Sequence, residues 1–167
     1  MSTEDNSYLL SVGRLEAYKR VDRIIAALPH FPKDYTLALI GLGPQCVRLE
    51  RLAECLNVRD RVQFLGRICD EELRDWYLRA RIVVSLSEGE SFGLVVRESL
   101  ASGCQVVCNN IPAFRDFSVE FPHAVSPVPP ICLVRNWQQC CVLRRPDPGT
   151  SMLICGGILG LESLPVF

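Results

Sequence analysis

The sequence lacks an excess of charge of either sign. Its 167 residues include 18 Lys and Arg against 19 Asp and Glu, a formal net charge of -1 at pH 7. Proteins that bind nucleic acid over a broad surface need a strong basic excess, so no nucleic-acid partner is expected. A content of 49% hydrophobic and 22% charged residues excludes disorder as a description of the whole chain. This length predicts one globular domain with a sizeable core.

Segments that would direct the protein out of the cytoplasm or into a membrane are also missing. The first residues, Met1–Asn6, are polar and acidic, unlike a signal peptide. The longest nearly apolar run, Met152–Leu161, is about ten residues long, which is too short to cross a bilayer. The sequence therefore predicts a soluble, cytoplasmic protein with no transmembrane segment.

Patterns that bind metal ions are sparse. The two histidines, His30 and His123, stand apart, and none of the nine cysteines forms a Cys-x-x-Cys pair. An odd cysteine count without an export signal favours reduced thiols over disulfides. Four cysteines fall within apolar patterning and are expected in the core: Cys46, Cys55, Cys104 and Cys108. No metal site is expected.

The first 116 residues alternate between strand-like and helix-like segments. Short, nearly continuous aliphatic runs are typical of strands buried on both faces of a sheet. These runs are Tyr8–Val12, Thr36–Ile40, Val62–Leu65, Ile82–Leu86 and Gln105–Cys108. Between them, apolar residues recur at helical spacing around residues 21–28, 49–56 and 73–80, and a weaker helix is expected over about 93–102. Asp70 is the expected N-cap of the third helix.

This alternation predicts an α/β fold with a Rossmann-like, doubly wound parallel sheet of strand order 3-2-1-4-5, because parallel strands are joined by right-handed crossovers. The predicted domain spans residues 7–116. Residues 117–167 hold seven of the eleven prolines and four of the nine cysteines, and they show no helical period. We interpret them as an atypical Pro- and Cys-rich tail that is poorly ordered.

Ligands bind at the carboxyl ends of the strands in open sheets of this kind. The loop after the first strand carries Gly13, then Arg14 and Lys19, two cations five residues apart that precede a helix. Two positive charges beside the positive end of a helix dipole suit an anion. The alternative is that both are solvated surface charges, which are common.

The loop after the fourth strand enters a helix through small and flexible residues. The backbone amides of Phe92, Gly93 and Leu94 can therefore point at a ligand. Glu90 precedes the helix, and Glu98 lies four residues after Leu94, on the same helical face as the amides. Carboxylates are poor phosphate ligands, but they readily accept hydrogen bonds from sugar hydroxyls. The alternative is that the two glutamates only complement the helix dipole.

Four motifs follow one another along residues 8–116: Gly13-Arg14-Leu15 with Lys19, then Ile40–Pro44, Val62–Gly66, and Glu-x7-Glu from Glu90 to Glu98, continued by Ala101–Val107. In this order and at these spacings they resemble the C-terminal, donor-binding domain of GT-B glycosyltransferases. The resemblance is to the large retaining family called glycosyl transferases group 1, or family 4-like. It implies a site for a nucleotide-diphospho-sugar such as a UDP or GDP sugar.

The resemblance also implies how the diphosphate is held. Arg14 and Lys19 would neutralise it, together with the helix terminus at Gly93 and Leu94. Asp-x-Asp, the usual means of binding a diphosphate through a divalent cation, does not occur in the sequence. Cationic side chains and a helix terminus would then replace the metal, so no metal and no other cofactor is expected.

For the rest of the donor, the resemblance implies that Glu90 and the amides of Phe92 and Gly93 hold the sugar, with Glu90 as the catalytic residue. Glu98 would accept hydrogen bonds from the ribose hydroxyls. The base would lie along the backbone of Gly66, Arg67 and Ile68.

The activity implied is retaining hexosyl transfer by a complete GT-B enzyme. The acceptor, a glycan, a lipid or a small molecule, would bind an N-terminal domain that this sequence lacks, so the isolated chain is expected to be inactive. One alternative is a non-catalytic nucleotide-sugar-binding or interaction module. Another is an NAD-binding Rossmann domain, because Gly41-x-Gly43 begins like Gly-x-Gly-x-x-Gly. However, Cys46 replaces the third glycine, and the motif follows the second strand instead of the first.

Overall fold

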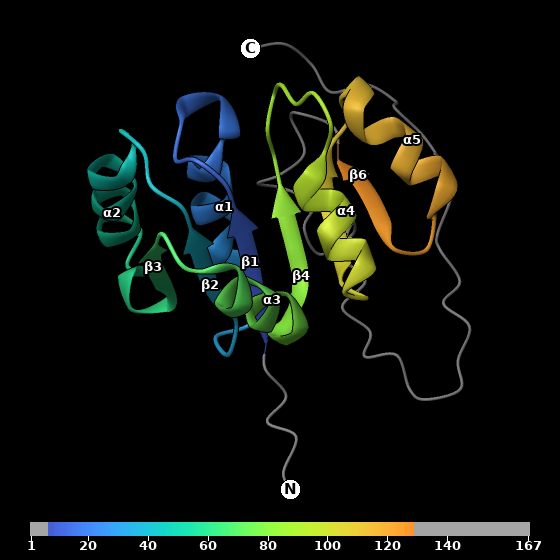
Figure 1. Ribbon diagram of the computed structural model, residues 1–167. Coiled ribbons are helices and arrows are strands. Elements are labelled where there is room, and N and C mark those ends of the chain that lie inside the picture. Colours follow the sequence, from blue (N-terminus) through green and yellow to red (C-terminus); the bar gives the residue numbers. More distant parts are fainter. Residues whose placement is uncertain (1–6, 129–167) are drawn as a thin grey trace, which may run out of the picture.

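Six parallel strands form one sheet in the computed structural model, which describes residues 7–128 (Figure 1). The strands are β1 (Tyr8–Val12), β2 (Thr36–Ile40), β3 (Val62–Gly66), β4 (Ala80–Ser85), β5 (Gln105–Asn109) and β6 (Val125–Val128). Their order across the sheet is β3-β2-β1-β4-β5-β6. The Rossmann-like, doubly wound class is thus confirmed, and the predicted order of the first five strands matches the structure.

Helices make the crossovers between consecutive strands. They are α1 (Val21–Ala27), α2 (Cys46–Cys55), α3 (Asp70–Arg79), α4 (Leu94–Ala101) and α5 (Pro112–Glu120), with short 3₁₀ turns η1 (Ala17–Lys19), η2 (Leu28–His30) and η3 (Arg59–Arg61). No helix among residues 7–128 combines the length and the apolar character needed to cross a membrane.

The core lies on both faces of the sheet, as the nearly continuous aliphatic strands require. On one face α1 and α2 pack against alternate residues of the strands, with Ile25 and Leu49 among the buried contacts. On the other face α3, α4 and α5 do the same, through side chains such as Tyr77, Val96 and Phe114. Burial of each large apolar side chain stabilises the fold by roughly 1.5–3 kcal/mol. The helices on both faces therefore stabilise the sheet and, with it, the carboxyl edge from which the loops extend.

Several predicted element boundaries were wrong by one or two residues. β3 and β5 each extend one residue further than expected, to Gly66 and Asn109. β4 was expected over Ile82–Leu86 but spans Ala80–Ser85. Asp70 is the first residue of α3, and its N-cap is Cys69, whose extended backbone places the thiol over the first turn. The Cys69 amide in turn donates to Glu72 Oε2 at 3.2 Å, which completes a capping box.

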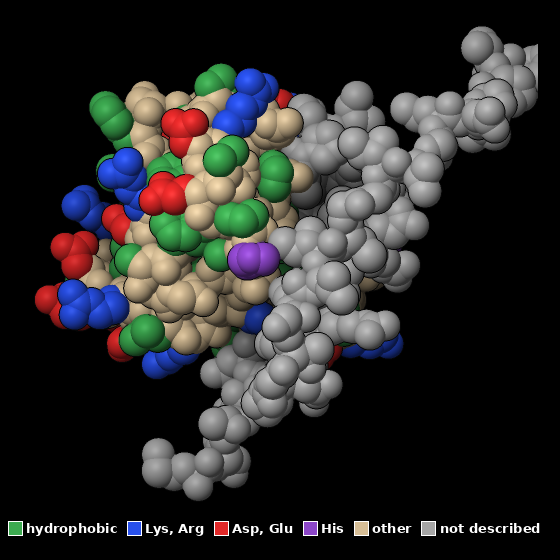
Figure 2. Space-filling model, turned by 90° about the vertical axis from the view of Figure 1, so that its right-hand side faces the viewer, with side chains coloured by type: hydrophobic (Ala, Val, Ile, Leu, Met, Phe, Trp, Pro, Cys, Tyr) green, Lys and Arg blue, Asp and Glu red, His purple; other side chains and the backbone are tan. Residues whose placement is uncertain are grey.

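The sheet continues past residue 116, where the regular structure was expected to end. α5 spans that position, and β6 pairs with β5 in the register Val106↔Val125. α5 begins with Pro112, a favourable first helical residue, and buries Phe114 and Phe117. Figure 2 shows this side of the molecule, where hydrophobic side chains also reach the surface. The prediction for the remaining residues, 129–167, lies outside the described part of the chain.

The cysteine expectation holds for two of the four residues named. Cys104 and Cys108 are buried, and burial raises the pKa of the Cys108 thiol to about 12. Cys46 is half-buried at the start of α2. Cys55 is exposed, contrary to the prediction, because it lies at the end of α2 on the helix face opposite to Leu49 and Ala53.

Candidate functional site

The loops that follow β1, β2 and β3 are joined backbone to backbone at the carboxyl edge of the sheet. The Gly13 amide donates to the Ile40 carbonyl at 2.9 Å, and the Gly41 amide donates to the Gly66 carbonyl at 2.7 Å. Gly41 has φ +134°, and a Cβ atom there would overlap the Gly13 carbonyl oxygen. Only glycine permits both this dihedral and this approach. The loops thus form one connected rim.

The loop after β4 is tied to the loop after β1. The Glu88 amide donates to the Tyr18 carbonyl at 2.8 Å, and Lys19 Nζ forms an ion pair with Glu90 Oε1. The Lys19 and Glu90 side chains are only 17% and 22% exposed. Two candidate residues that are 71 positions apart in the sequence are therefore in direct contact, because β1 and β4 are neighbours in the sheet.

A second ion pair strengthens the same connection. Arg20 lies between η1 and α1 with φ +52°, a left-handed conformation that costs a non-glycine residue about 1 kcal/mol. This conformation accompanies an ion pair between Arg20 Nη1 and Glu88 Oε1 at 3.1 Å. Arg20 Nε also lies 3.4 Å from Asp22 Oδ1. The sequence analysis did not find Arg20 or Glu88, since adjacent surface charges give no signal of a contact across the sheet.

Arg14 is near Lys19 but more exposed. Its side chain is 76% exposed and pairs with Glu16 at 2.8 Å. Both cations line one small hollow of about 10 Å³, whose other walls include Ser85 and Leu86. A hollow of this size holds about one water molecule. A larger anion would therefore lie across the surface of this edge, where the exposed Arg14 side chain can reach it.

The α4 helix begins beside this contact. Its N-cap, Gly93, has φ +60° and is buried, and a Cβ atom there would lie 2.9 Å from Phe117 Cε2. No side chain of residues 7–128 caps the helix, and no acidic residue occupies its first turn. The side chains of Phe92 and Leu94 are 76% and 62% exposed. Within the described part of the chain, the first-turn amides of α4 thus have no side-chain acceptor and can donate hydrogen bonds to an anion or a polar ligand.

Glu98 lies one turn further along α4 and is held by a residue from α3. The Tyr77 hydroxyl donates to Glu98 Oε2 at 2.8 Å. Burial, followed by this hydrogen bond, raises the pKa of Tyr77 above its usual range, so the phenol stays a neutral donor. Glu98 itself is exposed, and among the described residues its other carboxylate oxygen has no partner, so it can accept a hydrogen bond from a ligand. The sequence showed Tyr77 only as an apolar helix position.

Replacing Tyr77 by phenylalanine is expected to lower the free energy of unfolding by about 1 kcal/mol, because one hydrogen bond to a carboxylate is lost while the ring stays packed. Urea denaturation of the full chain measures this change. Tyr8→Phe is the control, since Tyr8 is a half-buried tyrosine whose ring packs against Trp76 but whose hydroxyl forms no hydrogen bond with Glu98 in the described part of the chain. Equal stability of parent and Tyr77→Phe would mean that the hydroxyl does not hold Glu98.

The three residues expected to contact the base lie on the same edge. Gly66 ends β3 with φ +66°, Arg67 is exposed, and the partly buried Ile68 packs against the apolar cluster that contains Tyr77. Their backbone adjoins the Gly41 loop through the Gly41–Gly66 hydrogen bond. They belong to the same rim as Lys19 but lie two strands further along the sheet.

A buried polar pair that the sequence analysis missed lies beneath the Glu90 loop. Asn109, at the end of β5, is 5% exposed, and its Nδ2 donates to the Ser87 carbonyl at 3.3 Å. Ser87 Oγ donates to the Gly89 carbonyl at 2.8 Å. In the sequence, the polar Asn109 at the carboxyl end of a buried strand was the feature that could have indicated this pair. Together these bonds fix the path of the loop that carries Glu90.

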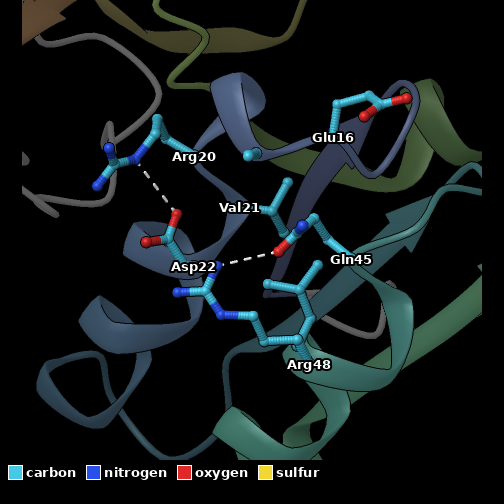
Figure 3. A pocket seen from close by; sticks show the side chains of 8 residues that line it. Glu16, Arg20, Val21, Asp22, Gln45 and Arg48 are labelled. Atoms are coloured by element: carbon cyan, nitrogen blue, oxygen red, sulfur yellow. Dashed lines mark hydrogen bonds and ion pairs between the residues drawn. The ribbon is translucent and has the colours of Figure 1, made fainter.

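A separate hollow of about 120 Å³ lies between the η1–α1 segment and the start of α2 (Figure 3). The charged side chains in its wall pair with neighbours. Arg20 and Asp22 form one pair, and Arg48 Nη1 donates to Gln45 Oε1 at 3.0 Å. The wall therefore offers a ligand little unpaired charge, and we do not assign a function to this hollow.

Residues 2–124 match the family model described as glycosyl transferases group 1. The chain belongs to this family. A similar curated group 1 protein is the D-inositol 3-phosphate glycosyltransferase of Xylanimonas cellulosilytica, 37% identical over 115 residues that cover 66% of this chain and 28% of the relative. The chain thus spans less than a third of that relative.

Solved structures of similar proteins agree with the GT-B resemblance. Sucrose-phosphate synthase from Thermosynechococcus elongatus is 32% identical with a TM-score of 0.69, over 77% of this chain and 34% of that protein. The Anabaena protein HepE, solved in complex with UDP-glucose, is 25% identical with a TM-score of 0.65, over 74% of this chain and 34% of HepE.

Membership of group 1 leaves the nicotinamide alternative without support. Gly41 and Gly43 have another structural role, since a Cβ atom at either position would overlap the backbone of the loop after β1, at Gly13 and Leu15 respectively. Their spacing reflects the close packing of two loops and not a dinucleotide fingerprint.

Proposed function

We propose that the chain is the donor-binding half of a retaining, metal-independent glycosyltransferase that uses a nucleotide-diphospho-sugar. One observation carries the proposal: the β1 and β4 loops bring Lys19, Glu90 and the uncapped N-terminus of α4 to one edge of the sheet. Cationic and amide donors suit the diphosphate, and the carboxylate suits sugar hydroxyls. The similarity to HepE, solved with UDP-glucose, supports this assignment.

Each part of the site then has a distinct task. Arg14, Lys19 and the α4 terminus at Gly93 and Leu94 hold the diphosphate and stabilise the charge that it gains as it leaves. Because these groups themselves supply positive charge and hydrogen-bond donors where the diphosphate lies, a divalent cation is not needed. Glu98 accepts hydrogen bonds from the ribose hydroxyls, and the backbone of residues 66–68 lines the pocket for the base.

Glu90 acts on the sugar. Its carboxylate accepts hydrogen bonds from the sugar hydroxyls and stabilises the positive charge that develops at the anomeric carbon. In a retaining reaction the acceptor attacks the face from which the phosphate departs, and the departing phosphate helps to deprotonate it. On this mechanism no side chain of this half needs to be a general base. The acceptor would bind a second domain of the complete enzyme.

Calorimetry of the 167-residue chain tests the proposal. The ligands are UDP-, GDP- and ADP-glucose, the free nucleoside diphosphates, NAD and NADP. At least one nucleotide sugar is expected to bind, equally with and without EDTA, and the nicotinamide nucleotides are not. Binding by none of the sugar nucleotides would refute the proposal. If the complete protein bound donor but transferred sugar to no acceptor, the chain would belong to a non-catalytic binding module.

In the complete enzyme, Glu90→Gln is expected to lower kcat by at least tenfold and to change the donor dissociation constant by less than about threefold, because the carboxylate acts mainly in the transition state. Steady-state kinetics and donor titration measure the two effects. Glu120→Gln, at the end of α5, is the control and is expected to match the parent. Equal losses in kcat and affinity would contradict this role of Glu90.

A further inference from the structure

The contact between Lys19 and Glu90 joins two groups that the proposed function assigns to different parts of the donor. Lys19 is assigned to the diphosphate and Glu90 to the sugar, yet Lys19 Nζ is paired with Glu90 Oε1. The pair leaves the edge without a net charge at this point. An arriving diphosphate therefore meets a cation that already has a partner, and a carboxylate beside it.

The backbone prevents the two loops from separating to break this contact. The Glu88 amide is bonded to the Tyr18 carbonyl at 2.8 Å, and the Arg20–Glu88 ion pair spans the same two segments. Beneath the loop, Asn109 holds Ser87. These contacts favour an arrangement in which Glu90 stays close to Lys19 and the two side chains, not the loops, rearrange.

The two side chains are also shielded from water, at 17% and 22% exposed, so salt and solvent screen the charges less than at an open surface. A lysine ammonium has three donor hydrogens and can contact a phosphate while it keeps Glu90. The phosphate and the carboxylate then repel each other across the shared ammonium. A sugar on the diphosphate offsets this repulsion, because its hydroxyls donate hydrogen bonds to the carboxylate.

We infer that the Lys19–Glu90 ion pair makes the site discriminate between the sugar-bearing nucleotide and the bare nucleoside diphosphate. The inference rests on the proposed function. The carboxylate raises the affinity for the donor relative to the product, because only the donor carries sugar hydroxyls that offset the repulsion between Glu90 and the phosphate. The chain therefore releases the nucleoside diphosphate more readily than its phosphate-binding groups alone would allow.

The test compares Glu90→Gln with the parent chain in calorimetric titrations of UDP and UDP-glucose, and of GDP and GDP-glucose. Glu90→Gln is expected to bind the bare diphosphate roughly three- to tenfold more tightly, as removal of one nearby like charge implies. Its preference for the sugar nucleotide over the diphosphate is expected to fall by at least the same factor. A loss of one ordinary binding contact would instead weaken both ligands.

Glu88→Gln is the matched control. It removes the same charge from the same loop, keeps an acceptor for Arg20 and has no contact with Lys19 among the ion pairs of the described residues. Its affinity for the bare diphosphate is expected to stay within twofold of the parent. If the Glu90→Gln variant is unstable, Glu90→Ser, which removes the same charge, is titrated in its place.

The possible outcomes separate the inference from the proposed function. If the parent binds both ligands and Glu90→Gln leaves the diphosphate affinity unchanged or lower, the inference is wrong and the proposed function stands. If Glu88→Gln tightens diphosphate binding as much as Glu90→Gln, the effect is one of overall charge and the inference is also wrong. If the parent binds no nucleotide, the proposed function fails, and the inference fails with it.

Discussion

Lys19→Ala is expected to weaken nucleoside-diphosphate binding by roughly ten- to a hundredfold, since a charge-assisted contact contributes about 1.5–3 kcal/mol and each decade of affinity is about 1.4 kcal/mol. The diphosphate carries about two negative charges, and the carboxylate of Glu90 loses its partner in this variant. Arg14→Ala is expected to have at least as large an effect, because a guanidinium can engage two oxygens at once. Isothermal titration of the full chain measures both.

The sequence offers a matched control for this experiment. Lys33 is the other lysine of the chain, and it lies exposed in the turn before β2, at the opposite edge of the sheet. Lys33→Ala is expected to leave diphosphate affinity unchanged. A nucleoside without phosphates is expected to bind all variants alike. If Lys19→Ala remained within twofold of the parent, or if its loss disappeared as salt was raised, Lys19 would be a surface charge and the donor site would lie elsewhere.

Gly41→Ala is expected to lower the free energy of unfolding by more than about 3 kcal/mol, through a strained dihedral together with a backbone overlap. The position has φ +134°, and the added Cβ would meet the Gly13 carbonyl oxygen, which has no flexible side chain to move aside. The rim would have to open between β1 and β2. Urea denaturation followed by circular dichroism measures the change.

Two other glycines separate the causes of this effect. Gly103 has φ +78° with open space around it, so Gly103→Ala tests the dihedral alone and is expected to cost about 1 kcal/mol. Gly89 has open space and no positive φ, and Gly89→Ala is expected to change stability by less than about 0.5 kcal/mol. A cost for Gly41→Ala no larger than that for Gly103→Ala would show that the two loops are not in close contact.

Local patterns were sufficient to predict most of the sheet. The bounds of β1 and β2 match the predicted strands, because each is a mostly aliphatic run with glycine directly after it. α5 and β6 were missed for a physical reason. α5 buries only one short stripe, at Phe114 and Phe117, and β6 has four residues, one of them Pro127. Proline is tolerated there because β6 has only one strand beside it among the described residues.

The candidate site was predictable only as a set of separate loops. The sequence indicated that Lys19 and Glu90 follow strands that meet in the sheet, but not that the two side chains pair. The Tyr77–Glu98 contact spans 21 residues and two helices, and the Arg20–Glu88 contact spans 68. Such contacts depend on crossover geometry and rotamers, which a pattern of apolar and charged residues does not specify.

The packing of Gly93 on Phe114 and Phe117 sets a limit on how far the protein can be shortened. The amides at the start of α4 rest on α5, so a fragment that ends at residue 116 would remove Phe117 and cut the helix that supports them. It would also leave β5 as a bare edge without β6, open to pairing with other chains. The smallest autonomous unit able to present these amides therefore extends at least to the end of β6, and truncation studies of this site need to begin from there.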